Sequence, residues 1–133
     1  KDKVKQNQIE KLVDFIGWIK ESDIPNYLSI SKLGLSPLHK NIHHDTTYAN
    51  KVFQYISIGC PVVSSNVIAQ SELVKKYEIG VIFEDNNVFD LSDKIIELHN
   101  DKNLYSRLKQ NCLDSIEKLN NSVISNQLIS IYE

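Results

Sequence analysis

One stretch near the middle of the chain constrains the fold more than any other, because a helix, its stop and a buried strand follow one another within it. Thr46 or Thr47 can cap the helix, since a hydroxyl accepts a hydrogen bond from a free amide of the first turn. Gly59 can take the left-handed conformation that ends a helix, and Pro61 prevents its continuation. The apolar pair Val62-Val63 then predicts a strand.

The helix of this stretch has two distinct faces. Its residues at helical spacing that should face a core are Tyr48, Val52, Tyr55 and Ile56. Asn50 and Gln54 lie four apart on another face, with Lys51 beside them. A helix N-terminus that carries a lysine and two amides suits an anion joined to a hydroxyl-rich group.

Short apolar strands alternate with helices along the whole chain. We expect strands at residues 13–18, 33–38, 61–65 and 80–83. Besides the helix above, we expect helices at residues 4–12, 22–31, 68–77, 88–100, 104–119 and 122–132, with Pro25 in the first turn of the second and a turn and cap at residues 85–87. This order predicts one α/β domain over residues 1–133, with a Rossmann-like parallel sheet flanked by helices.

Ligands of such sheets bind beyond the carboxyl ends of the strands, where we expect three loops, at residues 17–19, 37–47 and 64–66. The second is the longest and opens directly into the helix, which favours a functional loop. His39, His43 and His44 crowd it with Asp45 and could bind zinc, but solvent-facing histidines are the more common case, and we expect no metal. We expect Trp18 to cover the sheet edge rather than to stack on a ligand.

Composition excludes several classes of protein. The net charge of −2 argues against a general polyanion binder, so no nucleic-acid partner is expected, and no apolar run approaches a membrane span. Cys60 and Cys112 have no metal or redox spacing and read as free thiols in a reducing cytoplasm. The chain contains no methionine, which indicates a piece of a longer protein.

The central stretch also resembles the donor-binding motif of retaining group 1 glycosyltransferases, which have the GT-B fold. The resemblance lies in Asn50-Lys51-Val52-Phe53-Gln54-Tyr55 and in Gly59-Cys60-Pro61-Val62-Val63-Ser64-Ser65. Weaker matches precede and follow it in the family's order, at residues 15–18, 27–38, 71–74, 80–84 and 128–133. It implies a partial C-terminal lobe of an enzyme that transfers a sugar from a nucleotide-diphosphate sugar to an acceptor, without a cofactor, in the synthesis of a surface polysaccharide or glycoconjugate.

The resemblance also assigns site residues. Backbone amides at residues 48–50, the helix dipole and Lys51 would bind the diphosphate, and Gln54 the ribose. Residues Gly17, Trp18 and Ile19 would lie under the base, while His39, Thr46 and Thr47 would approach the sugar. The family pattern has two glutamates that fall here at Thr46 and Gln54, so both carboxylates are absent, and the catalytic residues stay unknown.

The implied partners are the nucleotide sugar and the N-terminal lobe of the same enzyme, which is missing here together with the family's basic pair for the diphosphate. The full enzyme would be cytoplasmic, with peripheral association at the inner face of the membrane as an option. The alternative function is a ligand-binding α/β module without catalysis, which the two absent carboxylates favour. A receiver-like signalling domain fits poorly, because no acidic cluster follows a first strand.

Overall fold

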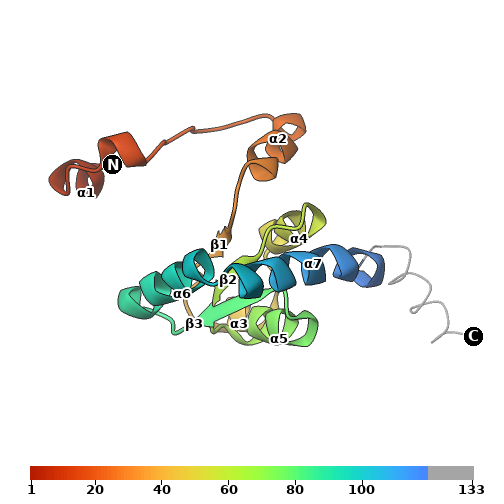
Figure 1. Ribbon diagram of the computed structural model, residues 1–133. Helices are drawn as coiled ribbons and strands as arrows, with labels where there is room; N and C mark the ends of the chain where they lie inside the picture. The colour runs from red at the N-terminus through yellow and green to blue at the C-terminus, as the bar shows by residue number, and fades with distance from the viewer. Residues whose placement is uncertain (120–133) are drawn as a thin grey trace, which may run out of the picture.

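The computed structural model describes residues 1–119, and a three-stranded parallel sheet lies at its centre (Figure 1). The strands are β1 (Gly34–Ser36), β2 (Val62–Ser65) and β3 (Gly80–Phe83), in the order β1-β2-β3. Gly34 pairs with Val62, which pairs with Gly80, and both ladders are parallel. The predicted α/β class, the parallel sheet and three of the four predicted strands are confirmed.

Helices cover both sides of this sheet. They are α3 (Ile42–Thr46), α4 (Asn50–Ser57), α5 (Ile68–Tyr77), α6 (Val88–Asn100) and α7 (Lys102–Leu119). Because the strands are parallel, the helix that joins two of them runs antiparallel to both. The N-terminal ends of α4 and α5 therefore lie toward the carboxyl edge of the sheet. The helix predicted at residues 122–132 lies outside the described residues.

Two cores sit on opposite faces of β2, whose successive side chains point to opposite sides. Val62 packs with residues of α4, α5 and α7, among them Val52 and Cys112. Its neighbour Val63 packs instead with Phe83, Leu98 and Leu108 on the α6 side. Because both faces are buried, the strand reads as a continuous apolar run rather than an alternating one.

Glycines and caps fix the element boundaries. Gly59 ends α4 with a φ of 69°, as predicted, and the Asn87 side chain caps α6 by accepting a hydrogen bond from the N–H of Asp90 at 3.0 Å. At Gly34, a Cβ would lie 2.2 Å from the Tyr55 ring, so only glycine lets that ring pack on β1. The Asn87 cap explains why α6 begins where predicted, and α5 and β3 also have the predicted bounds.

Residues 1–33 form an N-terminal segment that contains no buried residue, although its last residues contact the rest of the chain, for example where Tyr105 Oη donates to the carbonyl of Lys32 at 3.1 Å. The segment holds α1 (Asp2–Gln6), 3-10 turns at Glu10–Leu12 and Glu21–Asp23, and α2 (Ile24–Ser29), and these helices stand apart from the sheet in Figure 1. The strand predicted at residues 13–18 is wrong, because no neighbouring strand satisfies its backbone there. Trp18 is 87% exposed and does not cover the sheet edge.

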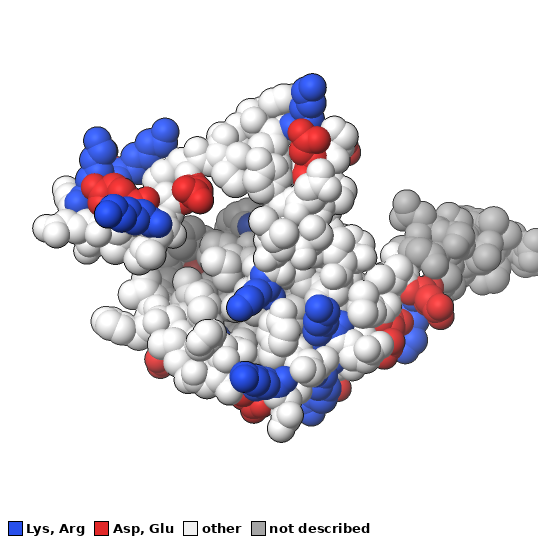
Figure 2. Space-filling view, turned by 45° about the horizontal axis from the view of Figure 1, so that its top comes forward, with Lys and Arg blue, Asp and Glu red and all other residues white. Residues whose placement is uncertain are grey.

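The predicted helix at residues 4–12 is also corrected, since the helix ends at Gln6 and a 3-10 turn follows. On the face shown in Figure 2, cationic and acidic side chains are interspersed, with no single basic patch. Cys60 and Cys112 are free and buried, as predicted. Within residues 1–119, no helix is long and apolar enough to cross a membrane.

Candidate functional site

The loops that follow the three strands meet at one edge of the sheet, because all strands are parallel. They are residues 37–41 after β1, 66–67 after β2 and 84–87 after β3. The first two loops were predicted at this edge from the sequence, whereas the predicted loop at residues 17–19 follows no strand in the structure. The loop after β3 was not predicted as part of the site.

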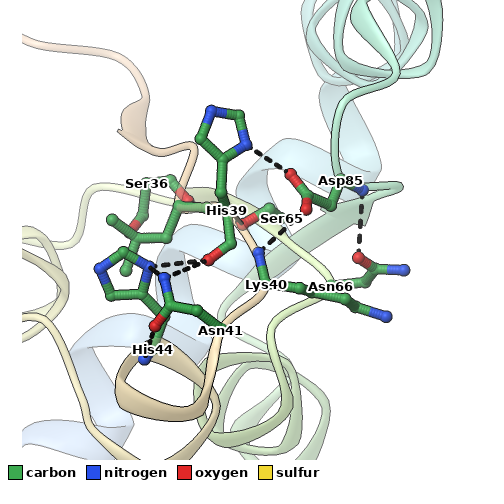
Figure 3. A network of polar contacts seen from close by, with 9 residues as sticks. Ser36, His39, Lys40, Asn41, His44, Ser65, Asn66 and Asp85 are labelled. Atoms are coloured by element: carbon green, nitrogen blue, oxygen red, sulfur yellow. Dashed lines mark hydrogen bonds and ion pairs between the residues drawn. The ribbon is translucent and has the colours of Figure 1, made fainter.

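Asp85 joins these three loops (Figure 3). Its carboxylate accepts hydrogen bonds from Nδ1 of His39 at 2.8 Å and from the N–H of Lys40 at 2.9 Å. The N–H of Asp85 in turn donates to Oδ1 of Asn66 at 3.0 Å. The Lys40 amide and the His39 ring hold the pKa of the Asp85 carboxyl below its ordinary value, so it stays ionised at neutral pH.

The loop after β1 contains a short helix that was not predicted from the sequence. Residues 39–45 were predicted as an irregular polar loop, but α3 begins after Asn41, whose Oδ1 accepts a hydrogen bond from the N–H of His44 at 2.9 Å. The Asp45 side chain of α3 accepts a hydrogen bond from the N–H of Ile68 at 2.9 Å and so binds a free amide of the first turn of α5. The Asn41 side chain is the N-cap signal that could have revealed α3.

The threonines predicted to cap α4 serve α3 instead. Thr46 Oγ1 donates to the carbonyl of Ile42 and Thr47 Oγ1 to that of His43, both at 2.7 Å. The N-cap of α4 is Ala49, which makes no side-chain cap. Because α4 begins only at Asn50, Tyr48 precedes it and is 50% exposed, so its predicted core position is also wrong.

The rest of the α4 prediction is confirmed. Val52 and Ile56 are buried in the core, and Tyr55 packs against them. On the polar side, Asn50 and Gln54 are exposed, and Lys51 between them is half-buried. Burial lowers the pKa of the Lys51 ammonium, because leaving water disfavours its charged form.

A buried polar cluster lies beneath this edge of the sheet. Ser36 Oγ donates to Oε1 of Gln70 at 2.6 Å, and both residues are fully buried. The Nε2 atom of Gln70 is buried and has no hydrogen-bond partner among the described residues. Ser64 and Ser65 are also buried, and Ser65 Oγ donates to the carbonyl of Leu38. Because both serines are buried at the end of β2, they are strand-end residues rather than candidates for a nucleophile.

The structure therefore divides the predicted site residues into groups. His39 lies in the Asp85 network, and Thr46 and Thr47 close α3. Tyr48, Asn50 and Lys51 lie at or beside the start of α4, and Gln54 lies one turn further along it. Gly17, Trp18 and Ile19 belong to the N-terminal segment and are not brought to the carboxyl edge by any described contact. No group of three metal-binding side chains gathers within residues 1–119.

The chain is similar in sequence to proteins of known families. The sequence model of the family described as glycosyl transferases group 1 matches residues 1–113. A chitobiosyldiphosphodolichol beta-mannosyltransferase of Candida glabrata is 33% identical over 96 residues, which are 72% of this chain and 20% of that protein. A Bacillus subtilis protein whose name assigns it to teichuronic acid biosynthesis as a glycosyltransferase is 21% identical over 91 residues, 67% of this chain and 23% of its own length. The chain thus spans about a fifth of the length of these relatives.

A solved structure resembles the fold. It is the C-terminal domain of a group 1 family glycosyl transferase from Francisella tularensis, with a TM-score of 0.74 and 24% sequence identity. The match covers 89% of this chain and 58% of that one. It confirms the predicted fold class, a parallel α/β sheet flanked by helices.

Proposed function

The chain belongs to the group 1 glycosyl transferases, and from this premise we propose that it forms the donor-binding part of an enzyme that transfers a sugar from a nucleotide-diphosphate sugar to an acceptor. The observation that carries the proposal is the start of α4. There Lys51, half-buried between Asn50 and Gln54, lies in the first turn of a helix that begins toward the carboxyl edge of a parallel sheet.

The chemistry of this turn favours a diphosphate. A lysine in a first turn is repelled by the helix dipole, and burial adds a second cost that shows in its lowered pKa. An anionic ligand relieves both costs, while the free N–H groups of the turn supply further hydrogen bonds. The ribose would be bound by Gln54, whose amide oxygen can accept from its hydroxyls.

The acceptor and the remaining catalytic groups would come from an N-terminal lobe of the same enzyme. The two relatives bear the names of a mannosyltransferase and of a teichuronic acid glycosyltransferase. We therefore favour a surface polysaccharide or glycoconjugate as the product, made in the cytoplasm or at the inner face of the membrane. The placement of residues 17–19 under the base stays a prediction.

A second candidate is a nucleotide-sugar-binding module without catalysis. Thr46 stands where the family pattern has a glutamate near the sugar, and its hydroxyl donates into α3 rather than outward. Gln54 replaces the other carboxylate. Both roles share the same donor site, and they differ in whether the full protein turns over its ligand.

Titration calorimetry with the matched series of uridine, UDP and UDP-sugar, repeated for the adenine and guanine series, tests the proposal. We expect one diphosphate series to bind and its nucleoside to bind far more weakly. We also expect this chain alone to transfer no sugar, because the reaction needs the acceptor in register. Failure of all three diphosphate series to bind would overturn the donor-site proposal, and turnover above a boiled control would contradict the second expectation.

A further inference from the structure

Asp85 makes two contacts to the loop after β1, although β2 separates their strands. Its carboxylate accepts from Nδ1 of His39 and from the adjacent N–H of Lys40, at 2.8 and 2.9 Å. The Asp85 side chain is only 12% exposed, whereas that of His39 is 72% exposed. A largely buried carboxylate thus holds an imidazole ring that is itself exposed.

This contact fixes which ring nitrogen of His39 carries the proton. An ionised carboxylate has no hydrogen to donate, so Nδ1 must be the donor of the 2.8 Å contact. In the neutral ring, Nε2 is then a bare acceptor. Among the described residues Nε2 has no hydrogen-bond partner, and in Figure 3 it points away from the polar network.

The backbone around His39 is held as firmly as its ring. The carbonyl of His39 lies 2.7 Å from Nδ1 of His44 and accepts from Nδ2 of Asn41 at 3.2 Å. A small hollow of about 110 Å³ borders the pair, with Phe83 and Leu91 among its lining residues. That volume is too small for a nucleoside.

We propose that Asp85 is a positioning residue for the donor sugar, which acts by holding His39 as the Nδ1–H tautomer so that Nε2 accepts a hydrogen bond from a sugar hydroxyl. This inference rests on the proposed donor-binding function. A bare Nε2 cannot bond a diphosphate oxygen, since both are acceptors. The pair therefore distinguishes the nucleotide sugar from the nucleoside diphosphate, a distinction that Lys51 and Gln54 do not make.

Nitrogen NMR tests the tautomer without any ligand. Long-range ¹H–¹⁵N correlation spectra of the whole chain, with the His39 signals assigned through His39→Ala, report which ring nitrogen is protonated when the ring is neutral. We expect Nδ1–H in the wild type and the commoner Nε2–H in Asp85→Asn. The exposed Asp93→Asn on α6 serves as the matched control and should leave the His39 signals unchanged. An Nε2–H tautomer in the wild type would overturn the inference.

Binding tests the consequence. The measured quantity is the ratio of nucleotide-sugar to nucleoside-diphosphate affinity. Asp85→Asn should lower it about threefold to tenfold, the size of one hydrogen bond, whereas Asp93→Asn should not. If Asp85 acts through His39, the effect must vanish in a His39→Ala background. An unchanged ratio, or a loss that persists without His39, would overturn the inference. A wild type that binds no diphosphate would instead overturn the donor-site proposal, and this sugar contact with it.

Discussion

The N-terminal segment (residues 1–33) and the sheet body (residues 34–119) differ in burial, although both carry many apolar side chains. Residues 1–33 include Leu12 at 81% and Trp18 at 87% exposure, and none of them is buried. Beyond them, β2 and its neighbours bury Val62, Val63 and Ile79 completely. Since the family match runs through both regions, sequence likeness alone does not tell which part packs.

A β-strand needs a neighbouring strand more than it needs apolar residues. β2 has a neighbour on each side, and its backbone groups are paired. The apolar run at residues 13–18 has no such neighbour in the described chain, so its backbone stays unpaired and no strand forms.

Two glycine-to-alanine substitutions, one in each region, should show the largest difference in the free energy of unfolding. In Gly80→Ala, the new Cβ would lie 1.9 Å from the carbonyl oxygen of Val62, so β2 and β3 would have to separate. We expect a loss of about 3 kcal/mol or more in the free energy of unfolding. Gly17→Ala meets no atom within 4 Å, and its positive φ of 78° strains only the N-terminal segment. Urea unfolding should therefore show almost no change in Gly17→Ala. Similar losses of stability in both variants would show that the N-terminal segment is packed as tightly as the sheet body.

Large-to-small substitutions sharpen the same contrast. Ile79→Ala removes a fully buried side chain and should cost about 2–5 kcal/mol. Trp18→Ala removes a larger but exposed side chain and should change stability by less than about 0.5 kcal/mol. The two unfolding midpoints are measured by circular dichroism. A destabilised Trp18→Ala would mean that the N-terminal segment packs on the body.

The sequence predicted the body well and the N-terminal segment poorly, for the same physical reason. Local signals such as the Asn87 cap and the Gly59 stop mark boundaries wherever packing supports them. The Asp85 network was not predicted, because Lys40 and His39 lie 45 and 46 residues from Asp85, Asn66 lies 19 residues from it, and they meet only once the three strands are paired. Likewise α3 was missed, since a polar helix of one turn has no apolar periodicity.

Substitution of Lys51 should affect ligand binding but not the stability of the fold. Lys51→Ala should weaken a nucleoside diphosphate by about 1.5–3 kcal/mol and the matching nucleoside much less, because a charge-assisted bond is lost. Since burial lowers the pKa of Lys51 below 10.5, its charged form costs stability below that lowered pKa. Removing the charge should thus not destabilise the fold through electrostatics at pH 7. Diphosphate affinity in the wild type should fall as pH rises through the lowered pKa.

Calorimetry and thermal unfolding, run side by side, give both quantities for Lys51. Lys76→Ala is the matched control, because Lys76 lies in the last turn of α5, at the opposite edge of the sheet. Equal losses for nucleoside and diphosphate would assign Lys51 to folding rather than to a ligand.

Gln54 should give the smallest effect. Gln54→Leu should cost about 1–3 kcal/mol in ribonucleotide binding, while Gln54→Glu should retain or improve it, because a charged acceptor bonds more strongly. Stability should hardly change, since the side chain is exposed. The readout is the affinity ratio of ribonucleotide to 2′,3′-dideoxynucleotide, and a constant ratio in all three forms would show that Gln54 does not contact the ribose.

Titration of the ¹⁵N-labelled chain with a nucleoside diphosphate, followed through the backbone amide signals, shows where the ligand binds. We expect saturable shifts at residues 48–54, with smaller ones at 37–41 and 84–86, all at the carboxyl edge of the sheet. Shifts centred on residues 75–78 and 111–118, where α5 ends and α7 passes beside it, would place the ligand at the opposite edge and overturn the donor-site proposal.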